Sequence, residues 1–138
     1  MGSMRVAMAV ILVLHGASAL AGVAPPLAGT YSNVCVHPES GDLLGTELTF
    51  AGTADPGRVQ LQRYEGAAVA PEQLRMTARG TARYLHRGDG VAMMVLQRQG
   101  AALRVTYRDG QQASAGGTSE TLVVTAPGRT DRQRRPCR

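Results

Sequence analysis

The chain has 138 residues, 43% of them hydrophobic and 18% charged, and this length and balance suit a single folded domain. All fifteen basic residues are arginines, against ten acidic residues, and five of the arginines lie in the last eleven residues. The body over 22–127 is therefore neutral, with nine arginines and nine acids. A neutral body with one phenylalanine and no tryptophan lacks a base-stacking surface, so we expect no nucleic-acid partner.

Residues 1–21 are typical of a secretory signal peptide. Arg5 precedes an apolar run over 6–14, and small residues at 17, 19 and 21 provide cleavage sites for signal peptidase. The alternative is an uncleaved membrane anchor, which needs about eighteen or more apolar residues, but His15 and Gly16 interrupt the run earlier. We predict a bacterial exported protein, secreted or periplasmic, with no membrane span after cleavage.

Alternation of apolar and polar residues predicts β-strands through most of the mature chain. The alternation is clearest over 103–108, and it recurs over 47–50 and 59–62. Two other runs, 91–96 and 122–124, are apolar at successive positions and predict strands that are covered on both faces. Turn residues separate these segments, which favours hairpin links and an antiparallel meander.

The segment 71–79 fits two structures. Pro71 at its start and Gly80 after its end fit a short helix, whereas the alternation of Leu74 and Met76 beside β-favouring threonines fits a strand. We predict a strand and keep the short helix as the alternative. The fold class is then all-β, a small antiparallel meander barrel or sandwich of about 7 to 9 short strands. This β-barrel-like domain occupies 22–127, and a basic C-terminal tail follows over 128–138.

Cys35 and Cys137 are the only two cysteines, and in an oxidising compartment they form the only possible intramolecular pair. We predict a disulfide that tethers the tail to the first strand; free thiols or an intermolecular bridge are the alternatives. On a strand, Cys35 and His37 share a face and would suit a metal site or a nucleophile and its base. A disulfide removes both roles, so we expect no metal-binding residue.

Patterns typical of catalysis are missing from the sequence. No serine lies in a Gly-x-Ser-x-Gly elbow, and no glycine-rich phosphate-binding loop precedes a helix. The carboxylates Glu39, Asp42 and Glu47 are interpreted as solubilising charges rather than as a glycosidase pair. We therefore predict that the protein is not an enzyme, with no catalytic residue and no cofactor.

Gly29-Thr30-Tyr31, at the start of the first predicted strand, resembles the glycine-x-aromatic start of lipocalin and avidin-type secreted β-barrels. Those families usually have tryptophan where this chain has Tyr31. The resemblance implies a barrel, whose interior holds either packed side chains or one small ligand. For the second case, the ligand-binding candidates are the apolar residues Tyr31, Phe50, Met93 and Tyr107.

Residues 78–84 resemble the Ser-Gly-x-x-Tyr loop region of the periplasmic inhibitors of C-type lysozymes, which also join an early cysteine to a very late one. Arg79 occupies the serine position, and the later tryptophan and lysine motif of those inhibitors has no counterpart here. The resemblance implies a contact loop that contains Gly80, Arg83 and Tyr84.

The prediction from sequence is a non-catalytic binding protein that holds a small apolar ligand inside a barrel. The alternatives are a proteinaceous inhibitor of a hydrolase such as lysozyme, and a structural protein of the cell envelope. The identity of the ligand or protein partner and the oligomeric state stay open.

Overall fold

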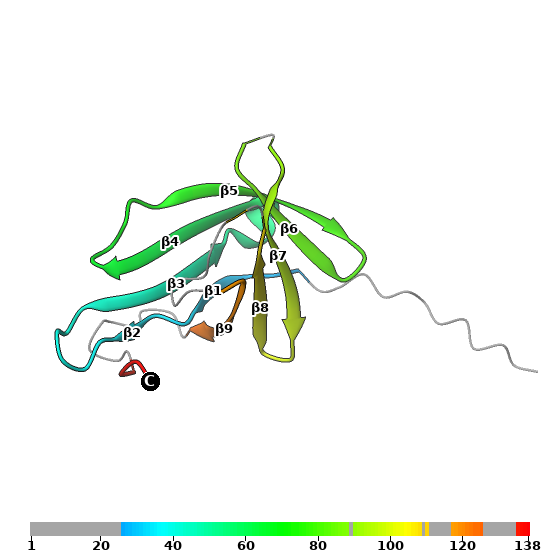
Figure 1. The fold of residues 1–138 in the computed structure, drawn as a ribbon. Helices are drawn as coiled ribbons and strands as arrows, with labels where there is room; N and C mark the ends of the chain where they lie inside the picture. The colour runs from blue at the N-terminus through cyan, green and yellow to red at the C-terminus, as the bar shows by residue number, and fades with distance from the viewer. Residues whose placement is uncertain (1–25, 89, 109, 111–116, 126–134) are drawn as a thin grey trace, which may run out of the picture.

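The computed structural model describes residues 26–88, 90–108, 110, 117–125 and 135–138. These residues form nine β-strands and one short 3-10 helix, Gly52–Ala54, so the all-β prediction is confirmed (Figure 1). The strands are β1 Gly29–Ser32, β2 Cys35–Val36, β3 Leu43–Phe50, β4 Arg58–Gly66, β5 Glu72–Arg79, β6 Ala82–His86, β7 Ala92–Gln99, β8 Ala102–Tyr107 and β9 Ser119–Thr125. The predicted signal peptide and residues 128–134 of the tail lie outside the described residues.

The strands form a closed antiparallel barrel. From β3 to β9 each strand pairs with the next along the chain, and β1 closes the ring by pairing with both β9 and β3. Eight strands make the ring, and β2 is an additional strand that pairs with β3. The meander is therefore confirmed, and the architecture is the barrel rather than the sandwich. The segment 71–79 contributes β5, so the strand prediction is confirmed and the helix alternative is wrong.

β2 continues the course of β1 along β3. Ser32 lies opposite Glu47 and Cys35 lies opposite Leu44, so the register is unchanged across the interruption at residues 33 and 34. The pairing of β1 with β9 ends at Ser32, and β2 therefore extends past the closed ring. We call this end of the barrel the β2 end.

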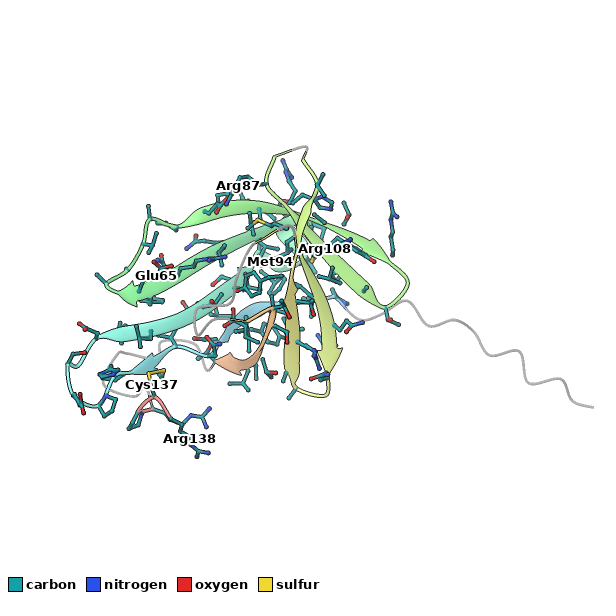
Figure 2. All side chains as sticks on the ribbon, in the orientation of Figure 1. Glu65, Arg87, Met94, Arg108, Cys137 and Arg138 are labelled. Atoms are coloured by element: carbon teal, nitrogen blue, oxygen red, sulfur yellow. A yellow bond between two sulfur atoms is a disulfide. The ribbon has the colours of Figure 1, made fainter. Side chains whose placement is uncertain are left out.

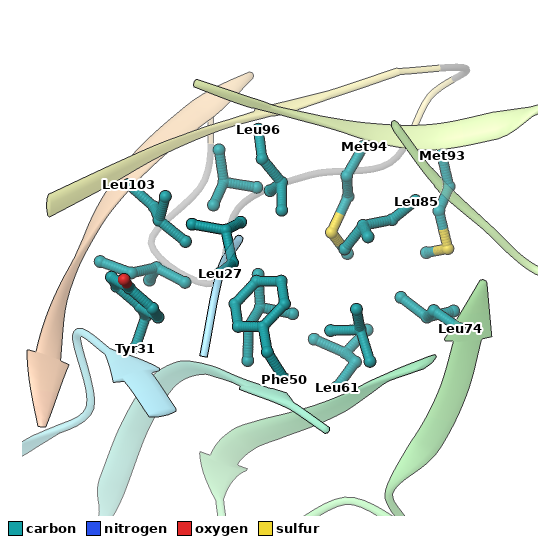
Figure 3. Close-up of a cluster of buried hydrophobic side chains, with 14 of the residues drawn as sticks. Leu27, Tyr31, Phe50, Leu61, Leu74, Leu85, Met93, Met94, Leu96 and Leu103 are labelled. Atoms are coloured by element: carbon teal, nitrogen blue, oxygen red, sulfur yellow. The ribbon is translucent and has the colours of Figure 1, made fainter. Parts of the chain in front are cut away.

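The hydrophobic core fills the barrel with side chains from every strand of the ring (Figure 3). The predicted alternation explains which residues point inward, for example Leu103 and Val105 of β8, which are almost fully buried. Fully burying one such aliphatic side chain contributes about 1.5 to 3 kcal/mol. The fifteen buried core residues are Leu27, Tyr31, Leu48, Phe50, Val59, Leu61, Leu74, Leu85, Met93, Met94, Leu96, Leu103, Val105, Tyr107 and Leu122.

The prediction that 91–96 is a strand covered on both faces holds only at the start of β7, where Ala92, Met93 and Met94 are buried in succession, and a β-bulge explains two of these buried residues. Leu85 lies opposite Met94, but His86 lies opposite Ala92, so Met93 is an extra residue in β7. A bulge changes the alternation of side chains, and both Met93 and Met94 are buried in the core. Val91, just before the strand, is 76% exposed.

The apolar run 122–124 in β9 is not covered on both faces, so that prediction is wrong. Leu122 is fully buried, whereas Val123 is 37% and Val124 52% exposed. Val123 lies on the outer wall, which has no second sheet to cover it. Val124 continues the inward row of Leu122 and lies opposite Tyr31, yet it is exposed, so three successive apolar residues do not require a strand buried on both faces.

The end of the tail docks beside β2, and the structure joins Cys35 and Cys137 by a disulfide with their Cα atoms 4.9 Å apart. The backbone N–H of Val36 donates to the carbonyl of Arg135 at 2.9 Å, and the N–H of Cys137 donates to the carbonyl of Val36 at 2.9 Å. Val36 and Pro136 thus form a parallel bridge. The predicted disulfide is confirmed, and it holds the chain end against the strand edge.

Candidate functional site

Five polar residues meet inside the barrel at its β2 end, and we call them the polar cluster. They come from five different segments, and Thr46 lies directly opposite Arg63 on the neighbouring strand. The members of the cluster are Asn33 between β1 and β2, Thr46 of β3, Arg63 of β4, Tyr107 of β8 and Glu120 of β9.

Glu120 is the centre of the hydrogen bonding in the polar cluster. Its Oε2 accepts a hydrogen bond from Nδ2 of Asn33 at 2.7 Å, and its Oε1 accepts one from the hydroxyl of Tyr107. Asn33 also accepts, through Oδ1, the backbone N–H of Thr46 at 2.7 Å. The Tyr107 hydroxyl lies 3.5 Å from Oγ1 of Thr46. These side-chain hydrogen bonds thereby link the first strands of the barrel along the chain to its last two, β8 and β9.

Arg63 brings a positive charge into the same region. Its Cζ lies 5.4 Å from the centroid of the Tyr107 ring, within the range of a cation–π interaction. One guanidinium nitrogen, Nη2, is buried and has no hydrogen-bond partner among the described residues. A buried donor without an acceptor costs about 1 to 3 kcal/mol, so this nitrogen marks a position where an acceptor group would be favoured.

The environment keeps the Tyr107 phenol protonated. Burial raises the pKa of Tyr107 well above its ordinary value of 10.0, and the charge of Glu120 and the hydrogen bond to it act in the same direction. The hydrogen bond with Thr46 and the charge of Arg63 act in the opposite direction and are weaker. The phenol therefore stays a hydrogen-bond donor to Glu120 at neutral pH.

Glu72, at the start of β5, is paired with Arg87 at the edge of this region. Two hydrogen bonds join them, one of which is the 2.9 Å bond from Nη2 of Arg87 to Oε2 of Glu72. The hydrogen bond from Arg87 lowers the pKa of Glu72 most, and the charges of Arg87 and Arg63 lower it further against the opposing effect of burial. Glu72 is thus near enough to Arg63 to interact with it electrostatically, but its carboxylate is already occupied by Arg87.

The four predicted ligand-binding residues are all buried in the core. Tyr31, Phe50, Met93 and Tyr107 are between 4% and 6% exposed, and the rings of Tyr31 and Phe50 meet edge to face with centroids 5.6 Å apart. Figure 3 shows the first three pointing into the same cluster of buried hydrophobic side chains. Only Tyr107 belongs to the polar cluster. A ligand that contacts the other three would have to displace core side chains. Ligand binding by these residues stays a prediction.

The predicted contact loop is a tight turn between β5 and β6. Arg79 lies opposite Ala82, and Gly80 has a positive φ of 58° between them. Nη1 of Arg83 donates to the carbonyl of Gly80 at 3.4 Å, whereas Tyr84 lies further along β6, opposite Thr77. The structure brings Gly80 and Arg83 together at an exposed hairpin tip, and it places Tyr84 on the barrel wall.

The disulfide removes Cys35 from any role as a nucleophile or metal ligand. The neighbouring His37 accepts, through Nδ1, the backbone N–H groups of Glu39 and Ser40 at 3.4 Å, as expected for a turn residue. Within the described ranges, no group of three or more His, Cys, Asp or Glu side chains is arranged to hold a metal ion.

Four of the five members of the polar cluster were not predicted from the sequence. The alternation of the strands could have indicated two of them. Arg63 follows the buried Val59 and Leu61 at every second position of β4, and Glu120 lies two positions before the buried Leu122 in β9. A charged residue that continues an inward-facing row is a candidate interior residue. Asn33 gave no such signal, because its position depends on the interruption between β1 and β2.

Neither a protein-family model, nor a curated protein, nor a solved structure matches this chain. In the part of the chain that the structure describes, no helix has the length and apolar character needed to cross a membrane.

Tyr107→Phe is expected to lower the free energy of unfolding by about 1 to 3 kcal/mol at neutral pH, because Glu120 loses a donor inside the barrel. The ring, and with it the contact with Arg63, is kept. Urea denaturation measures the change, and Tyr84→Phe on the barrel wall is the matched control. Equal stabilities of the two variants would contradict a structural role for the hydroxyl.

The stability difference between the parent protein and Tyr107→Phe is also expected to depend on pH. Because the folded pKa of Tyr107 is raised, the stabilisation from its neutral phenol is complete below about pH 10, the pKa of an unfolded tyrosine, and is lost as the pH rises through the folded pKa. The stability difference between the parent protein and Tyr107→Phe should be constant from about pH 7 to 9 and should shrink above about pH 10. A difference that persists unchanged into stronger alkali would show that the phenol does not titrate as described.

Proposed function

We propose that this protein is an exported, non-catalytic binding protein whose small ligand binds at the polar cluster. The observation that carries the proposal is the buried Nη2 of Arg63, a donor without an acceptor among the described residues in the interior of a closed barrel. The resemblance of Gly29-Thr30-Tyr31 to lipocalin and avidin-type barrels points to the same class of function. The disulfide supports export, since such bonds persist in oxidising compartments.

The chemistry of the polar cluster defines what the ligand must offer. Both carboxylate oxygens of Glu120 already accept hydrogen bonds, and Glu72 is held by Arg87, so the available group is the Arg63 donor. A carbonyl, carboxylate or phosphate oxygen would satisfy it. The ligand is therefore expected to carry at least one strong acceptor.

The apolar surroundings of Arg63 define the rest of the ligand. Leu61 precedes Arg63 in the inward row of β4, and Met94 lies opposite Tyr107 on the neighbouring strand. Both are buried, and they belong to the hydrophobic core cluster of the barrel. A small ligand with an apolar body and one acceptor group fits this setting better than the wholly apolar ligand that the sequence predicts.

Solution NMR on the mature chain tests the proposal. A fragment set with neutral, cationic and anionic members is titrated into the labelled protein, and amide shifts are followed. We expect acceptor-bearing fragments to shift amides of Thr46, Arg63, Tyr107 and Glu120 together. If no fragment of any charge shifts these amides, the binding proposal is wrong.

A pair of arginine variants makes the test specific. Arg63→Gln should weaken binding of the responding fragment by about tenfold or more, as expected when a charged hydrogen bond is lost. Arg98→Gln, an exposed arginine of β7, is the control and should leave the affinity unchanged. Equal losses in the two variants would indicate an effect of net charge rather than a contact at Arg63.

The second candidate function, inhibition of a hydrolase, is favoured by the exposed tip at Gly80 with Arg83 folded against it. C-type lysozyme is the enzyme that the resemblance names. Inhibition that Arg83→Ala abolishes would support this candidate, and full lysozyme activity at a large excess of the protein would exclude that enzyme as the target.

A further inference from the structure

The neutral body of the protein divides into two halves of opposite charge. Residues 73–108, which form most of β5 and all of β6, β7 and β8, carry seven arginines and one acid. The rest of the body over 22–127 carries two arginines and eight acids. The four strands of the first group are consecutive in the ring, so these arginines belong to one continuous part of the barrel, which we call the basic half.

Most of these arginines are on the surface. Of the seven, only Arg83 is half-buried, and the other six are exposed: Arg75, Arg79, Arg87, Arg98, Arg104 and Arg108. The ion pairs that the structure shows here join Arg87 to Glu72 and Arg75 to Asp55, both with acids of the other half. Figure 2 shows Arg87 and Arg108 on this side of the barrel, away from Arg138 beside β2.

Two of the exposed arginines occupy one row across the outer wall. Arg79 lies opposite Ala82, Ala82 lies opposite Gln97, and Gln97 lies opposite Arg104. Three inter-strand spacings separate the two arginines, about 14 Å along the wall. The intervening side chains are uncharged, so the two guanidinium groups are spaced for separate anionic groups of one large partner rather than for one small anion.

We propose that the basic half is a docking surface for a flexible polyanion. Guanidinium groups bind phosphate and carboxylate oxygens with two hydrogen bonds. A flexible polymer that carries many phosphate or carboxylate groups can follow a convex barrel wall. A flat lipid surface touches a convex wall along a narrow line and reaches few of these residues at once. The surface is distinct from the polar cluster, since the row of Arg79 and Arg104 lies on the outer wall, whereas Tyr107 and Arg63 lie inside the barrel.

Binding to inorganic polyphosphate, measured by fluorescence anisotropy at several salt concentrations, tests the inference. We expect binding at about 50 mM salt that weakens linearly on a log–log plot as the salt concentration rises, with a slope set by the number of contacts. Arg79→Gln/Arg104→Gln should reduce that slope by about 2. Both positions are exposed, so thermal unfolding should stay unchanged.

The tail provides a matched control with the same change of charge. Arg135→Gln/Arg138→Gln removes two exposed arginines beside β2 and should leave the slope almost unaltered. A loss of binding in this variant, with the wall variant unaffected, would assign the interaction to the tail and overturn the inference. Absence of polyphosphate binding at low salt, or binding to anionic vesicles alone, would also overturn it. Equal binding of single-stranded DNA would support recognition of backbone charge.

Discussion

Replacement of both cysteines, Cys35→Ser/Cys137→Ser, is expected to lower the free energy of unfolding by about 4 to 5 kcal/mol. The two residues are 102 positions apart, so the disulfide closes nearly the whole folded domain into one loop and removes many conformations from the unfolded chain. A domain of this size has a total stability of about 5 to 15 kcal/mol. The loss would therefore be at least about a quarter of the total stability.

Urea denaturation of the double variant, and of the parent protein under reducing conditions, measures this effect in two independent ways. The two values should agree, since both remove the same cross-link. Amide hydrogen exchange at Val36 and Cys137 should accelerate most, because the bridge between β2 and the tail depends on the disulfide. Two free thiols in the purified parent protein, or an unchanged free energy of unfolding, would contradict the expected result.

The sequence was sufficient for the architecture because hydrophobic alternation and turn residues are local signals. β8 keeps its pattern without interruption, and Leu103, Val105 and Tyr107 are buried as predicted. The disulfide was also predictable, since two cysteines in a chain that is predicted to be exported allow one intramolecular pair. These inferences depend on residue type and spacing alone, and neither requires knowledge of which strands close the ring.

The polar cluster depends on contacts between distant segments, which spacing does not reveal. Asn33 and Glu120 are 87 positions apart and meet only because β1 pairs with β9. Met93 was predicted as a cavity residue, but a bulge that no sequence signal marked places it in the packed core. The neutral charge of the body over 22–127 likewise concealed two halves of opposite sign, because composition averages over positions that the fold separates.

The polar cluster and the barrel closure are structurally coupled at Asn33. Its amide group serves both Glu120 and the backbone of Thr46, and its own N–H donates to the carbonyl of Thr46 at 3.1 Å. The side chain thus replaces a normal backbone ladder bond at the point where β1 ends and β2 begins. Any change that moves Asn33 is expected to disturb both the strand pairing and the position of Glu120.

Gly45→Ala is such a change, and we expect it to lower the free energy of unfolding by about 3 kcal/mol or more. A Cβ at this position would lie 2.8 Å from Oδ1 of Asn33 and 2.8 Å from Cα of Val34, and the φ of Gly45 is +132°. The contact with Val34 is with the backbone, so no rotation of a side chain relieves it.

Gly41→Ala separates the two causes of the lower free energy of unfolding in Gly45→Ala, which are backbone strain and the steric clash of the added Cβ. Gly41 also has a positive φ, +77°, but a Cβ there meets nothing within 4 Å, so only the backbone strain of about 1 to 2 kcal/mol is expected. The difference between the variants measures the close approach of β3 to residues 33 and 34. In NMR spectra, Gly45→Ala should also shift the side-chain amide of Asn33, whereas Gly41→Ala should not. Equal stabilities and an unmoved Asn33 amide would show that the strands can separate here without cost, and Asn33 would then not fix the position of Glu120.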